Sequence, residues 1–302
     1  NIEVAGFGLS GRISDSAKWN LHADSRLHHM VLTPTFLEEP IRIRLGKLKA
    51  EETATGAYGG TVLRVEDVQT STGSNRVMAS GEIRLAPEDI ALDLALTAES
   101  IDWNEIQTLS DRLSRRRPTE SRAVKGRIGL HAEAFKIGSY DFHPLMAEAV
   151  LTPGGTTVAI ERADVCGIVL IGRLTFASGR LNAFIVPVAD NTLLDTTLTC
   201  LSEEKAMASG RFNLDGALQV NAPPAEFMKA LTGNLEVISE DGRFLRSNLF
   251  AKILGLINIT EIYRGTVPDL TGEGLEYKRM KLSAEFRDGK LIVNSWTLNG
   301  PS

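Results

Sequence analysis

Few residues of this 302-residue chain have the types and spacing that catalysis or ligand binding requires. Gly6, Gly8 and Gly11 match the GxGxxG pattern, whose glycines let a dinucleotide approach the N-terminus of a helix. Such a site needs a helix after the third glycine, but the segment 12–19 has no helical apolar face. We therefore interpret these glycines as turn residues. The sequence also lacks the phosphate-binding GxxxxGK[ST] motif and the GxSxG motif of serine hydrolases.

Three of the five histidines, His22, His28 and His29, lie close together in the sequence. A turn at Asp24-Ser25 would place His22 and His29 on one face of a hairpin, and imidazole is a common metal ligand. No third ligand is evident, so we expect neither a metal site nor a cofactor. Acidic pairs lie in predicted turns, and nothing selects two carboxylates as a general acid and base. The sequence therefore predicts a protein that is not an enzyme.

The two cysteines, Cys166 and Cys200, lie in segments whose composition is typical of strands. Neither belongs to a CxxC pair, which argues against a zinc site built on thiolates. They are either two separate buried thiols or one disulfide, and a disulfide requires an oxidising compartment. The spacing of the residues leaves both alternatives open.

Alternation of apolar and polar residues is the dominant pattern of the chain, as in segments 90–96 and 207–220. Side chains alternate between the two faces of a strand, so this pattern gives each strand one apolar face. A turn is expected at Asp215-Gly216, and further hairpin turns at 240–243 and at Asp288-Gly289. The residues predicted to line an apolar groove are Ile90, Leu92, Leu94, Leu96, Phe212, Leu214, Leu218, Val220, Leu282, Ala284 and Phe286.

Three short helices are predicted, at 103–116, 224–231 and 247–257. The second begins with Pro224 and is followed by Gly233. The third is the most apolar segment of the chain, and we interpret it either as a helix packed on the sheet or as a lid or membrane-facing element. The apolar face of this predicted lid helix comprises Leu249, Phe250, Ile253, Leu254 and Ile257.

Helices are too few for a βαβ architecture, so we expect an antiparallel meander. About fifteen to twenty strands spaced about 4.8 Å apart would make a very wide sheet. Open twisted sheets of that width rarely stay uncurled. The sequence therefore predicts a mainly β fold, with a long curled antiparallel sheet that forms one continuous, elongated groove over residues 1–302.

Composition excludes some functions and locations. The net charge of −5 argues against a nucleic-acid partner, which would call for a basic surface. No apolar run is long enough to span a bilayer as a helix. The sequence begins at Asn1, within a strand-like segment, and we expect it to be part of a longer protein.

The final third of the chain carries an ordered set of motifs. They are Cys200-Leu201, SGRFNLDGALQV at 209–220, LTGNLEVISEDGRF at 231–244, the apolar segment 249–265, Pro268-Asp269-Leu270, the segment 274–277 and the terminal LNGPS. Because these motifs occur in this order, residues 200–302 resemble the C-terminal region of AsmA-like proteins. Upstream of these motifs, only the segment ADVCGI around Cys166 resembles the family.

The resemblance implies a periplasmic segment of a lipid-transfer protein whose parent is anchored in the inner membrane of a Gram-negative bacterium. Its partners would be phospholipid, the inner membrane through a part missing from this chain, and outer-membrane or periplasmic proteins. Phospholipid acyl chains would move along the groove between the inner and outer membranes, in support of outer-membrane biogenesis. The resemblance also favours a Cys166–Cys200 disulfide. The alternative function is a non-enzymatic assembly or structural factor of the outer membrane that acts through protein contacts.

Overall fold

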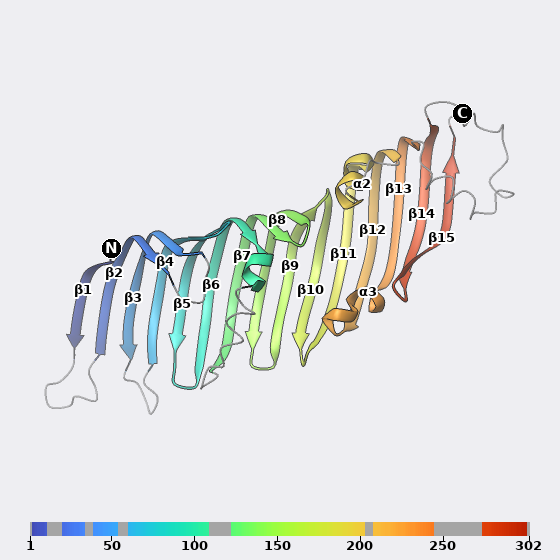
Figure 1. The fold of residues 1–302 in the computed structure, drawn as a ribbon. Helices are drawn as coiled ribbons and strands as arrows, with labels where there is room; N and C mark the ends of the chain where they lie inside the picture. Colours follow the sequence, from blue (N-terminus) through green and yellow to red (C-terminus); the bar gives the residue numbers. More distant parts are fainter. Residues whose placement is uncertain are drawn as a thin grey trace. The chain divides into compact units, whose positions relative to one another are not determined.

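The structure is a computed structural model that describes residues 2–10, 20–33, 39–53, 60–108, 122–202, 208–244 and 274–300. Fifteen strands form one sheet, and each strand pairs with its neighbours in sequence (Figure 1). The strands are β1 (Ile2–Ser10), β2 (Asn20–Leu32), β3 (Ile41–Thr53), β4 (Gly60–Thr72), β5 (Asn75–Leu85), β6 (Asp89–Asp102), β7 (Ala123–Ile137), β8 (Tyr140–Thr152), β9 (Gly155–Val165), β10 (Ile168–Ala177), β11 (Arg180–Leu193), β12 (Ala208–Ala222), β13 (Thr232–Phe244), β14 (Leu275–Arg287) and β15 (Lys290–Asn299).

The chain divides into two compact units. Unit 1 comprises residues 1–163 and 175–178, and unit 2 comprises residues 164–174 and 179–302. The predicted fold class is confirmed, because the protein is mainly β, with a largely antiparallel sheet and a few short helices. The sheet is open and is not strongly curled, so the curl is weaker than its width led us to expect.

One strand pair departs from the predicted antiparallel meander. β6 and β7 are parallel, with Ile90 beside Val124 and Ile101 beside Phe135. The chain leaves β6 at Asp102 and re-enters the sheet at Ala123, so twenty residues connect the two strands. Parallel strands require such a long connection, whereas a short hairpin joins antiparallel strands. The start of this connection, residues 103–108, is helical.

The predicted helices have different outcomes. Residues 103–108 confirm the start of the first, and the rest of that prediction lies outside the described residues. The second is confirmed as a 3₁₀ turn, η2 (Pro224–Glu226), followed by α3 (Phe227–Ala230). The predicted lid helix lies outside the described residues. A helix that we had not predicted, α2 (Leu194–Ser202), lies between β11 and β12 and includes Cys200.

Two of the three hairpin turns predicted at 215–216, 240–243 and 288–289 are wrong. Asp215-Gly216 lies inside β12, and segment 240–243 lies inside β13. Leu214 and Leu218 stay on one face with Gly216 between them, and the pairing with β13 continues through all three, so the chain does not reverse here. Asp288-Gly289 is confirmed as the turn between β14 and β15. Gly6 and Gly8 lie within β1 and not in a turn.

Candidate functional site: the apolar face of the sheet

In unit 1, register places the predicted groove residues on one face. Residues that are partners across neighbouring strands point to the same side of a sheet. Leu94 is the partner of Gly81 on β5 and of Ile128 on β7. A row is a line of cross-strand partners on neighbouring strands. The rows through Ile90, Leu92 and Leu96 are also apolar: Leu85–Ile90–Val124, Ile83–Leu92–Gly126 and Ala79–Leu96–Leu130. Ile90, Leu92, Leu94 and Leu96 therefore share a continuous apolar face, which we call the apolar face of unit 1.

The side chains of this face are only partly covered by the described residues. Ile90, Leu92, Leu94 and Leu96 are all half-buried, because they pack laterally against neighbours in the sheet. Helix 103–108 covers one end of the strands, where Ile106 packs against a buried cluster of Ala98, Ile101, Ala132 and Phe135. The described part of unit 1 thus leaves apolar side chains accessible away from that end.

The opposite face of unit 1 is charged. Lys49 Nζ lies 2.6 Å from Glu66 Oε1, and Arg64 lies 3.1 Å from Glu51 and 3.7 Å from Glu82. The hydrogen bond between Lys49 and Glu66 raises the pKa of Lys49 and lowers that of Glu66. Exposed pairs of this kind add little stability. They mark this face as the one that contacts water.

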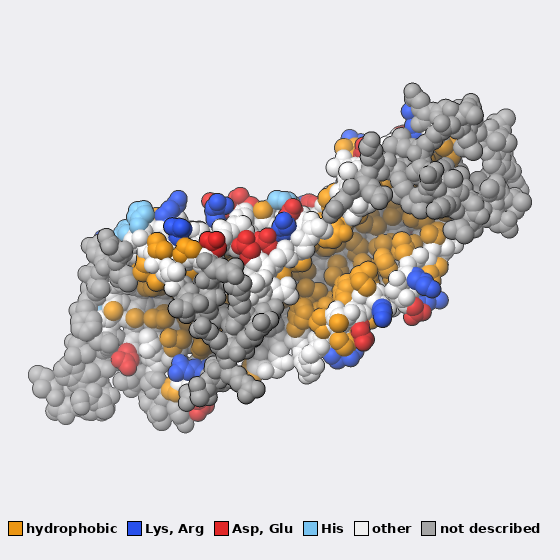
Figure 2. Space-filling view, viewed as in Figure 1, with side chains coloured by type: hydrophobic (Ala, Val, Ile, Leu, Met, Phe, Trp, Pro, Cys, Tyr) orange, Lys and Arg blue, Asp and Glu red, His pale blue; other side chains and the backbone are white. Residues whose placement is uncertain are grey.

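In unit 2, the predicted groove residues also share one face. Leu214 is the partner of Val237, which is the partner of Leu282. The other five predicted residues, Phe212, Leu218, Val220, Ala284 and Phe286, lie on the same side of the sheet. Their rows of cross-strand partners are Phe212–Ser239–Met280, Leu218–Gly233–Phe286, Ala183–Val220 and Leu235–Ala284–Val293. Figure 2 shows hydrophobic side chains gathered on this face of unit 2. We call it the apolar face of unit 2.

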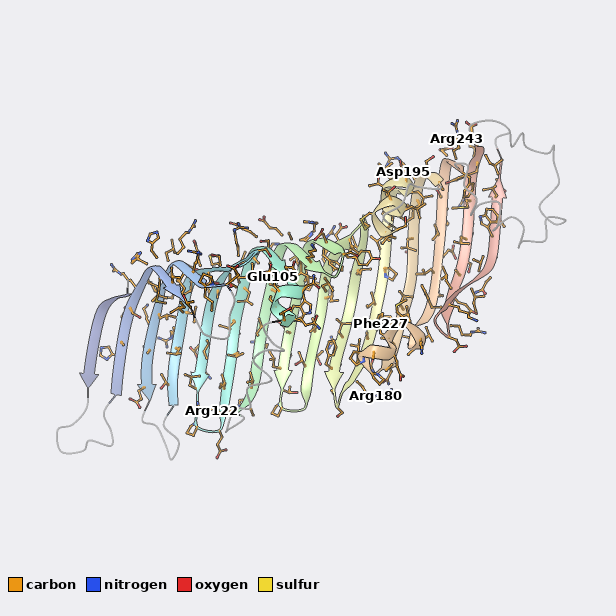
Figure 3. The ribbon with its side chains drawn as sticks, viewed as in Figure 1. Glu105, Arg122, Arg180, Asp195, Phe227 and Arg243 are labelled. Atoms are coloured by element: carbon orange, nitrogen blue, oxygen red, sulfur yellow. A yellow bond between two sulfur atoms is a disulfide. The ribbon has the colours of Figure 1, made fainter. Side chains whose placement is uncertain are left out.

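Two short helical elements cover parts of the apolar face of unit 2. Leu194 and Leu198 of α2 pack against Phe212 and Leu214, which are 4% and 6% exposed. At the other end of the strands, Phe227 of α3 packs in a cluster with Val220 and Leu181 (Figure 3). Leu218, Leu282 and Phe286 are half-buried, whereas Phe212, Leu214, Val220 and Ala284 are buried. The groove prediction therefore separates into covered and accessible positions.

A disulfide joins Cys166 and Cys200 and ties α2 to the turn between β9 and β10. The hydroxyl of Thr197 on α2 donates to the carbonyl oxygen of Cys166 at 2.7 Å. A helix of nine residues is marginal by itself, so these contacts and its apolar packing hold α2 on the sheet. The sequence alone did not reveal α2, because its threonines are also typical of strands.

Candidates for chemistry do not assemble in the part of the chain that the structure describes. Asp24-Ser25 lies within β2 and not in a turn, and His22, His28 and His29 are exposed on that strand. No group of three or more His, Cys, Asp or Glu residues that could hold a metal occurs among the described residues. None of the described helices is long and apolar enough to cross a membrane.

Comparison with known proteins gives no match: no family model, curated protein or solved structure is similar to this chain. The resemblance of residues 200–302 to AsmA-like proteins accordingly stays a prediction. The apolar faces of the two units are the strongest functional feature of the described residues.

Proposed function

We propose that this chain is a non-enzymatic segment of an AsmA-like lipid-transfer protein, and that the apolar faces of its sheet hold phospholipid acyl chains. One observation carries this proposal. Strand after strand in each unit presents apolar side chains to one face, while described residues cover only parts of that face. A sheet that needs no bound partner would bury its apolar face against a second layer.

The energetics of such a surface favour acyl chains. Burial of each methylene group contributes about 0.8 kcal/mol, so two acyl chains can be held without any single essential contact. Leu92 and Leu94 in unit 1, and Leu218 and Leu282 in unit 2, are half-buried and still have surface to bury. Contacts between hydrocarbon groups are not directional, so the proposed site discriminates poorly between acyl chains and allows them to slide.

The proposed location is the periplasm, with the parent protein anchored in the inner membrane through a part outside this chain. The Cys166–Cys200 disulfide supports an oxidising compartment without deciding which one. In this proposal the protein uses no cofactor and binds no nucleic acid, and its further partners are outer-membrane or periplasmic proteins.

The test is native mass spectrometry of the purified protein with extraction of bound lipid, for wild type, Leu94→Asp and Ala95→Asp. Leu94 lies on the apolar face of unit 1, and Ala95 is exposed on the opposite face. Loss of two methylene contacts costs about 1.6 kcal/mol, so Leu94→Asp should weaken lipid binding about tenfold or more. Ala95→Asp introduces the same charge and should leave binding unchanged.

Two outcomes would contradict the proposal. One is a folded Leu94→Asp protein that keeps the wild-type amount of lipid. The other is a wild-type protein that is stable, monodisperse and free of lipid. Circular dichroism and urea midpoints of both variants separate a loss of binding from a loss of folding.

A second candidate function, an assembly or structural factor that acts through protein contacts, is favoured by one observation. α2 and α3 already cover Phe212, Leu214 and Val220 in unit 2, as expected for a sheet that seals its own apolar face. A wild-type protein that lacks lipid and does not bind added phospholipid would support this alternative.

A further inference from the structure

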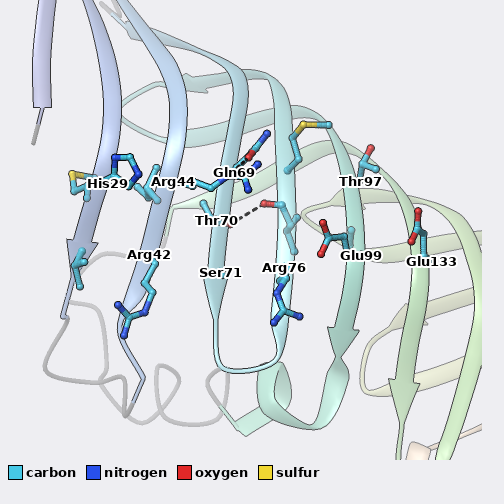
Figure 4. Close-up of a pocket in the computed structure, with 16 residues that line it drawn as sticks. His29, Arg42, Arg44, Gln69, Thr70, Ser71, Arg76, Thr97, Glu99 and Glu133 are labelled. Carbon is cyan, nitrogen blue, oxygen red and sulfur yellow. Dashed lines mark hydrogen bonds between the residues drawn. The ribbon is translucent and has the colours of Figure 1, made fainter.

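A hollow with a volume of about 530 Å³ lies in unit 1, over one end of strands β2 to β7 (Figure 4). Most of the side chains that line it lie on the charged face. Four lining residues each lie next to a residue of the apolar face in their strand, so their side chains point to the opposite side of the sheet. They are Arg42, Ser71, Met78 and Glu99, which adjoin Ile43, Thr70, Val77 and Ala98 respectively. Ile43, Thr70, Val77 and Ala98 also line the hollow, but the charged side chains that line it lie on the face opposite the proposed acyl-chain site.

The hollow arises where bulges interrupt several neighbouring strands. The register shifts between Ile43 and Lys47 in the β3–β4 pair, between Val65 and Val68 in the β4–β5 pair, and next to Arg76 in the β5–β6 pair. His29 on β2 has a φ of 47°. Bulges bend a strand and increase its twist. A series of them across adjacent strands bends this end of the sheet.

One wall of the hollow is cationic. Arg42 and Arg76 are both cross-strand partners of Ser71, so the serine hydroxyl lies between two arginines. Strands lie about 4.8 Å apart, which leaves the backbones of the two arginines about 10 Å from each other. Neither arginine has an ion pair or side-chain hydrogen bond in the described structure, whereas Arg44 donates to Gln69 at 2.8 Å. Two long guanidinium side chains on either side of a hydroxyl suit a phosphate group.

The opposite wall is anionic. Glu99 on β6 lies between Ala98 and Ser100, the partners of Ala132 and Ala134 on β7, so Glu99 and Glu133 are neighbours. Neither carboxylate forms an ion pair among the described residues. Like charges side by side on adjacent strands are unfavourable, and a bound cation would relieve the repulsion. Figure 4 shows the two glutamates on β6 and β7, beyond Arg76 when viewed from Arg42.

We propose that this hollow binds a small zwitterion that carries a phosphate ester and an amine, the chemistry of a phosphoethanolamine group. Arg42, Ser71 and Arg76 hold the phosphate, and Glu99 and Glu133 hold the ammonium. The group can come from a free phosphoethanolamine or from a phospholipid headgroup. The inference does not depend on the acyl-chain proposal, because it uses residues of the opposite face.

Isothermal titration calorimetry at low ionic strength tests this site, since salt screens exposed charges. The probes are phosphoethanolamine, inorganic phosphate and ethanolamine, each with the whole chain. Phosphoethanolamine should bind about tenfold more tightly than phosphate or ethanolamine, because only phosphoethanolamine contacts both the cationic and the anionic wall. Equal affinity for phosphoethanolamine and phosphate, or no saturable binding of phosphoethanolamine, overturns the proposal.

Paired variants assign the two walls. The double variant Arg42→Gln/Arg76→Gln should lose about tenfold or more in affinity for phosphoethanolamine and for phosphate. Glu99→Gln/Glu133→Gln should weaken phosphoethanolamine about tenfold and leave phosphate binding at least as strong. Arg84→Gln is the matched control, because Arg84 is an exposed arginine outside the hollow that pairs with Glu82. If the affinity for phosphoethanolamine is unchanged in either double variant, the residues of that wall do not bind the ligand.

A soluble short-chain phosphatidylethanolamine, used below its micelle concentration, distinguishes the two sources. Binding at least as tight as that of phosphoethanolamine, lost in Arg42→Gln/Arg76→Gln, identifies a lipid headgroup. Exclusion of the lipid, with phosphoethanolamine still bound, identifies the free molecule. Both results support the zwitterion site. Leu94→Asp should leave binding of phosphoethanolamine unchanged, so failure of the acyl-chain proposal is separable from failure of this one.

Discussion

Tyr277 is a buried side chain of unit 2 whose hydroxyl has two polar neighbours. It is 2% exposed, and its hydroxyl donates to the carbonyl oxygen of Ser209 at 2.8 Å. The same hydroxyl lies 2.8 Å from Ser239 Oγ, which also lies 3.0 Å from the carbonyl oxygen of Arg211, so the serine proton is donated to one of these two acceptors at a time. A β-carbon at Gly242 would collide with the tyrosine ring, so a glycine is required beside it. These contacts fix the ends of β12, β13 and β14 relative to one another.

Tyr277→Phe should lower the free energy of unfolding by about 1–2 kcal/mol, because the partly buried carbonyl of Ser209 loses its hydroxyl donor. Urea denaturation measures the change. In the double-mutant cycle with Ser239→Ala, the two effects should not add, since the side chains share a hydrogen bond. Additive effects would show that the two hydroxyls act independently.

Tyr277 also predicts a dependence of stability on pH. Burial raises the pKa of Tyr277, and the hydrogen bond with Ser239 opposes this only in part. The unfolded chain releases the phenolic proton near pH 10, whereas the folded protein holds it to higher pH. This contribution is therefore complete below about pH 10 and is lost as the pH rises through the folded-state pKa. The urea midpoint should fall more steeply between pH 9 and pH 11 in wild type than in Tyr277→Phe. An equal fall in the two proteins would show that Tyr277 does not cause the loss of stability.

At the scale of elements, helix 103–108 joins two turns of unit 1. Glu105 accepts hydrogen bonds from the backbone amide of Ser74 at 3.2 Å and from Asn75 Nδ2 at 2.7 Å, next to the turn between β4 and β5 (Figure 3). Asn104 exchanges hydrogen bonds of 3.0 and 3.3 Å with the backbone of Gly138, in the turn between β7 and β8. The helix therefore holds together turns that lie on either side of the parallel pair.

Glu105→Ala should destabilise unit 1 by about 2 kcal/mol, because the buried amide of Asn75 loses a charged acceptor. Hydrogen exchange should speed up at Ser74 and in residues 103–108, and much less in unit 2. Gln107→Ala is the matched control, because Gln107 is exposed on the same helix. Equal protection at Ser74 in Glu105→Ala and wild type would show that the helix does not depend on this contact.

At the scale of the whole molecule, the sequence predicted which residues share a face better than where strands begin and end. Leu214 and Leu218 were placed on one face even though Asp215-Gly216 was wrongly expected to reverse the chain. The period-two pattern is a property of the strand itself, whereas a turn depends on tertiary pairing. The parallel β6–β7 pair and the hollow over β2 to β7 depend on which strands pair and on where bulges shift their register. Cross-strand partners create both, and one strand's pattern does not reveal them.

Apolar faces that bind lipid should also make the stability of the protein depend on lipid. A ligand that binds only the folded state stabilises it by RT ln(1 + [L]/Kd), about 2.7 kcal/mol at a hundredfold excess over Kd. A soluble short-chain phosphatidylcholine should raise the urea midpoint of wild type and of Ala95→Asp, with a smaller shift in Leu94→Asp. Equal shifts in Leu94→Asp and wild type would place the stabilising lipid away from the apolar face of unit 1. The absence of any shift in wild type would instead mean that the described helices and lateral packing already satisfy the sheet, as the assembly-factor alternative requires.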